Sequence, residues 1–285
     1  MTGFLDGKAV VVTGAGRGLG AAYARLAAAE GAAVVVNDVD ESLAAAVAAE
    51  IRAAGGRAEA VPGSVADWSE AGAIVDACVS AFGAIDGLVN NAGIFRLAAP
   101  AEQEPDEFRA VVEVNVLGTA YCGLHAIRAM LPRGRGSIVN VTSGSHAGSA
   151  AMGAYGASKG AVASLTYCWA ADLAGTGVRV NAVSPNAHTR MADAYETYLG
   201  ASAQGQNVHK DPAQNAPAVV YLLSDAAALH GQVVRIDGDE LSMIAHPTVQ
   251  GDGALNPAWT VGSVAAAFEA GSVGPLSPVG LHRAL

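Results

Sequence analysis

Short apolar runs rich in valine and isoleucine alternate along the chain with longer, alanine-rich stretches. The apolar runs cover residues 9–13, 33–37, 58–62, 86–90, 136–142, 178–184 and 232–237. The stretches between them have the length and composition of helices, and they cover residues 18–30, 40–54, 67–82, 104–131, 153–174 and 212–224. Strands that are apolar along their whole length are typical of a parallel sheet that helices cover on both faces.

This order of elements predicts a single doubly wound α/β domain of the Rossmann type, with seven parallel strands. No repeat, linker or block of charge divides residues 1–238, which we assign to that domain. Residues 239–285 differ, because they are rich in glycine and proline and contain one helical stretch, at 261–270. We expect this C-terminal extension to pack on the same domain or on a neighbouring subunit.

The composition narrows the class of protein. The 285 residues carry a formal net charge of -10, and 52% of them are hydrophobic while 15% are charged. Such a chain can bury a large core, and it has no basic block that would follow a nucleic-acid backbone. The N-terminus lacks a signal-peptide pattern, no uninterrupted apolar run is long enough to cross a bilayer, and the cysteines do not stand at metal-ligand spacing. We therefore expect a cytoplasmic protein that acts on a small molecule, with no metal and no nucleic-acid or membrane partner.

The stretch TGAGRGLG, residues 13–20, lies between the first predicted strand and the first predicted helix. Glycine lets the backbone approach a diphosphate closely, and the N-terminus of a helix offers free N–H groups and the positive end of its dipole. We assign Gly14, Arg17, Gly18 and Leu19 to a dinucleotide site. The spacing from Gly14 is not the standard GxGxxG, so a simple glycine corner stays open as the alternative.

Asp38 follows the second predicted strand, where a carboxylate can accept hydrogen bonds from the adenosine ribose. Its alternative role is to cap the next helix, but Asp40 stands immediately before that helix and suits the cap better. A 2′-phosphate beside Asp38 would meet like charge, so we expect NAD as the cofactor. Arg17 is the counter-argument, because it could pair with the 2′-phosphate of NADP.

Polar residues gather where the middle strands are expected to end. Tyr155 and Lys159 are four apart at the start of a predicted helix and so share one face, although this spacing alone is weak. Ser143 ends one predicted strand and NNAG, residues 90–93, ends another. Asn115 lies on the helix between these strands. The carboxyl ends of parallel strands are where such sheets bind ligands, so we expect these residues to converge there.

Taken in this order, the motifs resemble the short-chain dehydrogenase/reductase family over about residues 6–238. The resemblance covers the glycine loop with its TGxxxGxG spacing, NNAG, the Asn115 helix, the serine, the YxxxK pair and the strand VRVNAVSP. It implies a catalytic group of Asn115, Ser143, Tyr155 and Lys159. It also implies cofactor contacts from Ser64, Val65, Asn91, Ala92, Gly93, Tyr155, Lys159, Pro185 and Thr189. Family members usually pair through helices, which implies a homodimer or homotetramer here.

The chemistry needs these residue types. Oxidation of a secondary alcohol requires a base for the hydroxyl proton, and tyrosine is too weak an acid in water to serve near neutral pH. A nearby lysine ammonium and a positive nicotinamide ring favour the phenolate, so we expect a lowered pKa at Tyr155. Ser143 would hold the substrate oxygen, Lys159 would also grip the nicotinamide ribose, and Asn115 would hold a water that links Lys159 to solvent.

Three departures from the family pattern bear on the site. Ser64-Val65 replaces the usual Asp-Val beside the adenine, and Pro185-Asn186 replaces Pro-Gly after the sixth strand. Ser143 and Tyr155 are one residue closer than usual, which leaves Ser145 open as the alternative serine.

The sequence thus predicts an NAD-dependent oxidoreductase that acts on a secondary alcohol or ketone. The pieces VVVND (34–38) and SPNAHTRM (184–191) resemble (3R)-hydroxyacyl-CoA dehydrogenase domains of multifunctional β-oxidation enzymes, and the substrate is expected to be a 3-hydroxyacyl thioester or a hydroxysteroid. The alternatives are an NADP-dependent 3-oxoacyl thioester reductase and, more remotely, a non-catalytic dinucleotide-binding redox sensor.

Overall fold

The computed structural model describes residues 3–187, 190–200, 211–249, 253–274 and 279–282. Its centre is one sheet with the strand order β3-β2-β1-β4-β5-β6-β7-β8. The parallel strands are β1 (Ala9–Val12), β2 (Ala33–Asp38), β3 (Arg57–Pro62), β4 (Gly87–Asn90), β5 (Gly136–Val141), β6 (Val178–Asn186) and β7 (Val233–Asp237). The order reverses between β1 and β4, so the predicted doubly wound Rossmann topology is confirmed.

The sheet has eight strands where the sequence predicts seven. The additional strand, β8 (Glu240–Ile244), runs antiparallel to β7 and pairs Asp237 with Glu240 and Val233 with Ile244. A two-residue turn, Gly238-Asp239, joins them as a hairpin. The C-terminal extension therefore begins inside the sheet.

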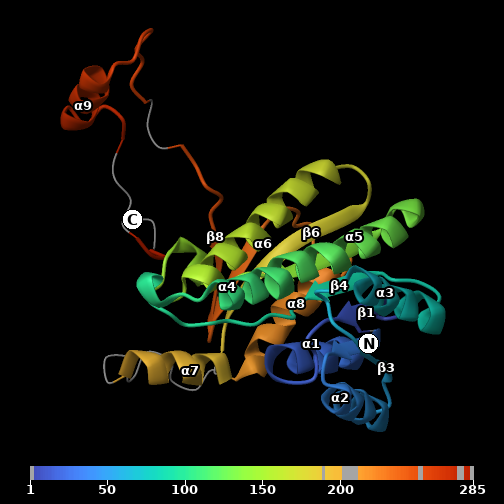
Figure 1. Cartoon of the computed structure of the whole chain (residues 1–285). Helices are drawn as coiled ribbons and strands as arrows, with labels where there is room; N and C mark the ends of the chain where they lie inside the picture. Colours follow the sequence, from blue (N-terminus) through green and yellow to red (C-terminus); the bar gives the residue numbers. More distant parts are fainter. Residues whose placement is uncertain (1–2, 188–189, 201–210, 250–252, 275–278, 283–285) are drawn as a thin grey trace.

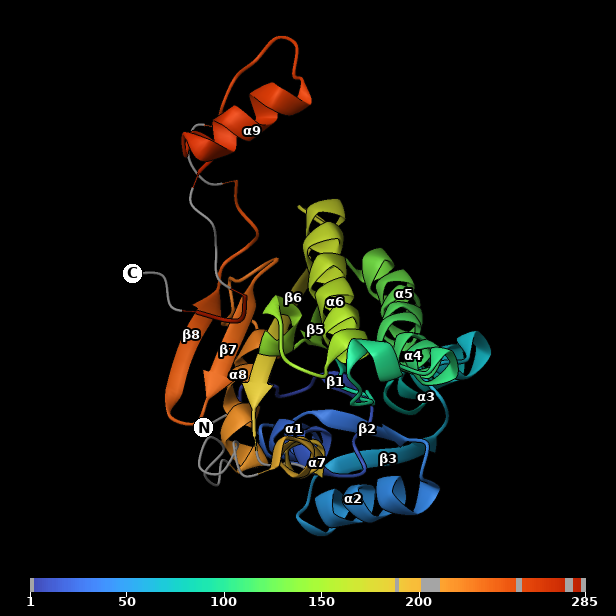
Figure 2. The same ribbon diagram turned by 60° about the vertical axis from the view of Figure 1, so that its left-hand side comes forward.

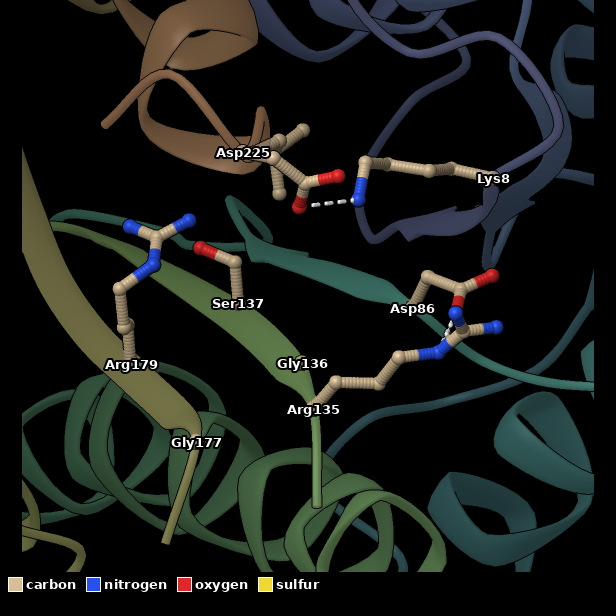
Figure 3. A pocket seen from close by; sticks show the side chains of 9 residues that line it. Lys8, Asp86, Arg135, Gly136, Ser137, Gly177, Arg179 and Asp225 are labelled. Atoms are coloured by element: carbon tan, nitrogen blue, oxygen red, sulfur yellow. Dashed lines mark hydrogen bonds and ion pairs between the residues drawn. The ribbon is translucent and has the colours of Figure 1, made fainter. Parts of the chain in front are cut away.

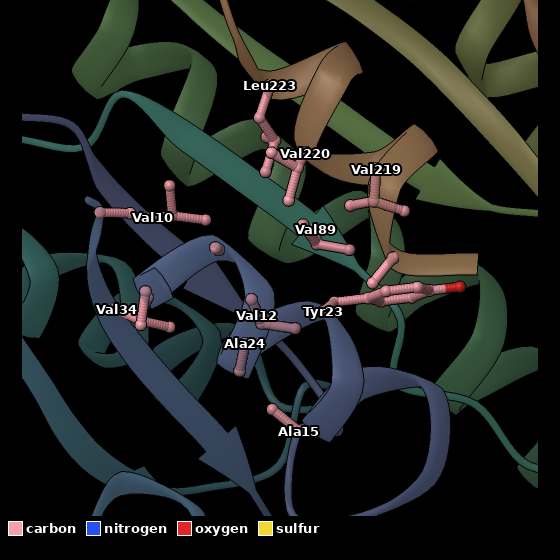
Figure 4. Close-up of a cluster of buried hydrophobic side chains, with 14 of the residues drawn as sticks. Val10, Val12, Ala15, Tyr23, Ala24, Val34, Val89, Val219, Val220 and Leu223 are labelled. Carbon is pink, nitrogen blue, oxygen red and sulfur yellow. The ribbon is translucent and has the colours of Figure 1, made fainter. Parts of the chain in front are cut away.

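Helices cover both faces of the sheet (Figure 1). The principal helices are α1 (Gly18–Ala29), α2 (Glu41–Ala53), α3 (Trp68–Phe82), α4 (Pro105–Val112), α5 (Gly118–Met130), α6 (Gly153–Asp172), α7 (Arg190–Leu199), α8 (Ala216–Leu223) and α9 (Val261–Glu269). Alternate residues of a strand point to opposite faces. Val10 and Val12 thus join a core with Tyr23 of α1 and Val219 of α8 (Figure 4), while Val11 joins a second core with α3 and α5. Both faces are covered, which explains why the strands are apolar at nearly every position.

The predicted helix over residues 104–131 is continuous but irregular. Between α4 and α5 the backbone forms one π-helical segment, Glu113–Leu117. The whole run, Pro105–Arg133, has a mean hydropathy of 1.3 over its most apolar window and passes the length and composition test for a membrane span. The chain was expected to contain no such uninterrupted apolar run, and this one carries charged residues at its start, including Asp106 and Glu113. It packs against α3 and α6.

The extension leaves the domain after β8 and comes back to it. Helix α9 stands apart from the body in both views (Figures 1 and 2), and none of its residues is buried. Further along, the Gly280 N–H donates to the Ala147 carbonyl at 2.9 Å. The last described residues thus lie against the segment that follows β5.

Candidate active site

The glycine loop forms the turn between β1 and α1. Gly14 has a φ of +61°, and a Cβ there would lie 2.8 Å from the Ala92 Cα. Gly18 has a φ of +55°, and a Cβ there would meet no atom within 4 Å. No side chain caps α1, whose N-cap residue is the exposed Arg17, followed by the part-buried Leu19. An uncapped helix N-terminus that faces open space fits the diphosphate of a dinucleotide.

Asp38 ends β2 beside this loop and is almost fully buried. Its Oδ2 accepts the Gly16 N–H at 3.0 Å, and its Oδ1 accepts the Asp40 N–H at 3.1 Å. Asp40 caps α2 as the sequence predicts, because its Oδ1 accepts the Leu43 N–H at 3.2 Å. Hydrogen bonds from Ser42 and Leu43, with a smaller contribution from the Arg17 charge, lower the pKa of Asp40.

The end of β4 braces the glycine loop. Asn91 Nδ2 donates to the carbonyls of Thr13 and Gly14, both at 2.9 Å. The hydroxyl of Thr13 accepts the N–H groups of Asn91 and Ala92, both at 3.1 Å. The Asn91 side chain therefore fixes the loop, and Thr13 is a positioning residue that the sequence reasoning noted only as the end of a strand.

The remaining residues assigned to the cofactor site differ in the contacts that they already make within the protein. Ser64 is part of a turn, since its hydroxyl accepts the Ala66 N–H at 3.2 Å, and Val65 is buried against Gly118. Pro185 lies in β6 opposite Ile236. The neighbouring Asn186 belongs to the same extended strand, so the position needs no left-handed backbone. Thr189 lies outside the described residues.

Asn115 sits in the π-helical segment and is fully buried. Its Oδ1 accepts the Ile94 N–H at 2.8 Å, and its Nδ2 donates to the Ile94 carbonyl at 2.8 Å and to Ser158 Oγ at 2.9 Å. A Cβ on Gly93 would lie 3.2 Å from Asn115 Oδ1 and 3.6 Å from Lys159 Nζ. The π turn thus directs the amide onto the backbone after NNAG, next to the lysine.

Ser143, Tyr155 and Lys159 converge at the carboxyl end of β5. The Ser143 hydroxyl lies close enough to the Tyr155 phenol to lower its pKa. Ser143 Oγ also accepts the N–H and the hydroxyl of Ser145, at 3.2 and 3.1 Å, which leaves its own hydrogen free to donate. Lys159 Nζ donates to the Val141 carbonyl at 2.7 Å and lies 5.6 Å from the centre of the Tyr155 ring. Ser145, the alternative serine, donates to Ser143 Oγ, and the choice of Ser143 stays a prediction.

The direction of the Tyr155 pKa differs from the sequence expectation. Burial raises the pKa of Tyr155 to about 12, and the nearby Ser143 hydroxyl offsets only part of that shift. Burial also lowers the pKa of Lys159 to about 8. The sequence expectation counted the positive charges of the lysine and of a nicotinamide ring but not the desolvation that accompanies burial.

Two further residues near this group in the structure or the sequence are distinctive. The ring of Phe95 packs edge-on against Tyr155, with 6.0 Å between centroids. Ala151, just before α6, has a φ of +59°, and it is the only described residue other than glycine with a positive φ. Backbone in this region is costly for alanine and is often found near functional sites. No sequence motif marks either residue, although Phe95 follows NNAG closely.

A cavity lies at the amino ends of the parallel strands, which we call the amino edge of the sheet, and charged side chains line much of it (Figure 3). It measures about 60 Å³ and is lined by Lys8, Asp86, Arg135, Gly136, Ser137, Gly177, Arg179, Leu223 and Asp225. Lys8 pairs with Asp225 at 2.6 Å, and Arg135 with Asp86 at 3.6 Å. This volume holds a few water molecules and no dinucleotide, so the cavity is separate from the site at the carboxyl edge. Among the described residues no group of His, Cys, Asp and Glu side chains could hold a metal ion.

A family model described as short chain dehydrogenase matches residues 8–197. The chain belongs to the short-chain dehydrogenase/reductase family. It is an oxidoreductase of the kind that acts on CH–OH groups, and members of this family bind a nicotinamide dinucleotide, act on small molecules and are commonly oligomeric.

Named relatives are dehydrogenases of secondary alcohols. The chain is 42% identical to cis-4-hydroxycyclohexanecarboxylate dehydrogenase of Sinomonas cyclohexanicum, over 81% of this chain and 95% of the relative. It is 38% identical to a 2,5-dichloro-2,5-cyclohexadiene-1,4-diol dehydrogenase of Sphingobium indicum, over 82% and 97%. It is 36% identical to a 3-alpha-(or 20-beta)-hydroxysteroid dehydrogenase of Mycobacterium tuberculosis, over 86% and 94%. The finer resemblance to hydroxyacyl-CoA dehydrogenase domains stays a prediction.

Solved structures share the fold and differ in how much of this chain they match. A short chain dehydrogenase from Mycobacterium avium matches 97% of this chain and 99% of its own, with a TM-score of 0.85 and 35% identity. A gluconate 5-dehydrogenase from Burkholderia cenocepacia, in complex with NADP and tartrate, matches 83% and 96%, with a TM-score of 0.76 and 34% identity. The first match leaves little of the C-terminal extension outside it.

Proposed function

We propose that this protein is an NAD-dependent dehydrogenase that moves a hydride between nicotinamide and a secondary alcohol or ketone. The observation that carries the proposal is the convergence of Ser143, Tyr155 and the buried ammonium of Lys159, whose Nζ lies 5.6 Å from the centre of the Tyr155 ring. A phenol, a hydroxyl donor and a cation at one point are what proton removal from an alcohol requires.

In this mechanism the residues of the site donate a hydrogen bond, accept a proton or supply a positive charge. Ser143 donates to the substrate oxygen, and Tyr155 takes the hydroxyl proton as the carbon is oxidised. The bound nicotinamide would supply hydride acceptance and a positive ring charge. Burial alone raises the pKa of Tyr155 to about 12, so ionisation of the phenol depends on positive charge nearby, including protonated Lys159. Asn115 holds the backbone beside Lys159 in place through its bonds to Ile94.

The preference for NAD rests on the glycine loop and Asp38. The residues proposed to bind the cofactor are Gly14, Arg17, Gly18, Leu19, Asp38, Ser64, Val65, Asn91, Ala92, Gly93, Tyr155, Lys159, Pro185 and Thr189. The Asp38 carboxylate is anchored by two backbone N–H groups, which supports a role in meeting the adenosine ribose. Arg17 and the NADP complex of the related gluconate 5-dehydrogenase favour the alternative, NADP.

The proposed substrate is a hydroxylated ring compound. The relatives named after hydroxycyclohexanecarboxylate, cyclohexadienediol and hydroxysteroid share a secondary alcohol on a ring. The Phe95 ring beside Tyr155 supports this choice, because an aromatic face suits an apolar ring. A 3-hydroxyacyl thioester is the alternative substrate class.

We further propose that the protein is cytoplasmic and forms a homodimer or homotetramer. In this proposal the dehydrogenase domain covers residues 1–238 and the extension covers residues 239–285.

Replacement of Tyr155 by Phe tests the proposal. The variant should lose turnover of ring alcohols with NAD by about 10²- to 10⁴-fold, because the proton acceptor is gone. NADH binding, followed by nucleotide fluorescence, should persist. Tyr167→Phe on the same helix is the matched control, since Tyr167 packs on His246 away from Ser143. Undiminished turnover in Tyr155→Phe would exclude the role of Tyr155, and NADH binding without any turnover in the wild type would favour the redox sensor.

A further inference from the structure

The last described residues, Val279–His282, form what we name the C-terminal clasp. The clasp contacts the short segment Gly144–Gly148 at three points. The Gly280 N–H donates to the Ala147 carbonyl at 2.9 Å. A Cβ on Gly148 would lie 2.5 Å from Val279 Cγ1, and a Cβ on Gly144 would lie 3.2 Å from Leu281 Cδ2. The two chain segments are therefore in direct contact, although more than 130 residues separate them.

The segment under the clasp starts immediately after Ser143. Its first turn is a 3-10 helix that orients this serine, because the Ser145 N–H and hydroxyl both donate to Ser143 Oγ. The ring of His146 bonds back to the Ser143 carbonyl. Tyr195 of α7 lies 3.5 Å from the carbonyl of Ala150, two residues beyond the segment. A shift of the segment would therefore move Ser143, which precedes it and receives both bonds from Ser145.

We infer that the C-terminal clasp is a positioning element of the active site, which holds the Gly144–Gly148 segment so that Ser143 faces Tyr155. The inference rests on the proposed dehydrogenase function and deepens it. The segment needs such support because two of its five residues are glycines and two more are Ser145 and Ala147, so it fills little space of its own. An error of about 1 Å in the position of a catalytic group can reduce the rate by about 100-fold.

The comparisons match different shares of this chain. The hydroxycyclohexanecarboxylate and hydroxysteroid dehydrogenases match 81% and 86% of it, whereas the M. avium structure matches 97%. We expect the clasp to be needed for the position of the serine equivalent to Ser143 in chains that carry the extension.

The first experiment removes the clasp from the full protein by ending the chain at Gly274. We expect kcat with NAD and a ring alcohol, such as cis-4-hydroxycyclohexanecarboxylate, to fall about tenfold, with KM and NADH affinity within twofold of the wild type. Amide hydrogen exchange in a peptide that spans residues 142–153 should become about tenfold faster, and this readout needs no substrate. The control is Phe268→Ser on the exposed face of α9, which should change neither quantity.

The second experiment tests the contact itself. Gly144→Ala should lower kcat several-fold, because its methyl group meets Leu281, and Leu281→Ala in the same chain should restore most of the loss. Arg235 also lies 3.2 Å from that methyl position, but the end of a flexible side chain can move aside.

The outcomes separate the two proposals. Unchanged hydrogen exchange in the truncated chain would overturn the clasp, whatever the activity. A change confined to KM would overturn it as well, because the tail would then contact substrate and not position the serine. Loss of activity on Tyr155→Phe together with full activity on truncation would leave the dehydrogenase proposal intact and remove the clasp.

Discussion

Lys8 and Lys159 occupy opposite edges of the same sheet in opposite electrostatic settings. Lys8, at the amino edge, pairs with Asp225 at 2.6 Å, and the side chain of Asp225 is 89% exposed. Lys159, at the carboxyl edge, is 4% exposed and donates to a backbone carbonyl, and no acidic residue in the described part of the chain forms an ion pair with it. Burial lowers the pKa of Lys159 to about 8.

The contrast separates charges that support the fold from charges that are available for chemistry. At the amino edge Asp86 accepts from Arg133 at 3.0 Å and from the Ala9 N–H at 3.0 Å, so cation and anion satisfy each other. At the carboxyl edge the buried ammonium has no counterion among the described residues, which is unfavourable for stability. A protein retains such a group where a reaction uses it.

The largest expected effect comes from removal of each lysine in turn. Lys159→Met should reduce kcat/KM by about 10²- to 10⁴-fold, because the cation that favours the Tyr155 phenolate is lost. Lys8→Met should leave kcat/KM within about twofold and cost less than about 1 kcal/mol of stability, since its partner Asp225 is exposed to solvent, which screens the pair. Steady-state kinetics and urea unfolding measure both. Equal losses of activity in the two variants would abolish the distinction between the edges.

The next largest effect is expected on nucleotide preference, from removal of the Asp38 charge at the proposed cofactor site. Asp38→Asn should lower the preference for NADH over NADPH by about tenfold, because repulsion of the 2′-phosphate disappears. Fluorescence titration with each nucleotide measures the ratio. Asp225→Asn removes the same charge at the amino edge and should leave the ratio unaltered. A similar change of the affinity ratio in both variants would point to the net charge of the protein and not to a ribose contact of Asp38. Tighter binding of NADPH than of NADH by the wild type would mean that Arg17 outweighs Asp38.

Asp86 should affect stability and not catalysis. Asp86→Asn leaves Arg133 without its carboxylate and weakens the bond to the Ala9 N–H, so the free energy of unfolding should fall by about 1–3 kcal/mol. Urea unfolding gives this value, and kcat/KM of the folded variant should stay within about twofold. A large kinetic effect at constant stability would contradict a purely structural role for the amino edge.

The smallest effect is a difference in pH dependence between the wild type and Lys159→Met. Unfolded lysine keeps its proton up to its ordinary pKa of 10.5, while folded Lys159 releases it near pH 8. Above pH 8 the unfolded state binds more protons, so this group adds stability as the pH rises. From pH 8 to 9.5 the stability of the wild type relative to Lys159→Met should increase by about 1–2 kcal/mol, measured by urea unfolding. A constant difference would mean that Lys159 is not desolvated.

The sequence by itself determined the alternating strands and helices and the convergence of the site motifs. These follow from local periodicity and from the rule that parallel strands end at one edge, and neither needs a distant contact. Asp40 as the cap of α2 is equally local, because a cap bonds within three residues of itself.

Only the tertiary structure decided what depends on segments far apart. Strand β8 exists through its pairing with β7, and its own sequence was assigned only to a glycine- and proline-rich extension. The direction of the Tyr155 pKa required its burial, and the return of Gly280 to Ala147 required the path of the whole extension. Pairing, desolvation and long-range contact depend on which surfaces meet in space, and the local pattern of apolar and polar residues carries no record of that.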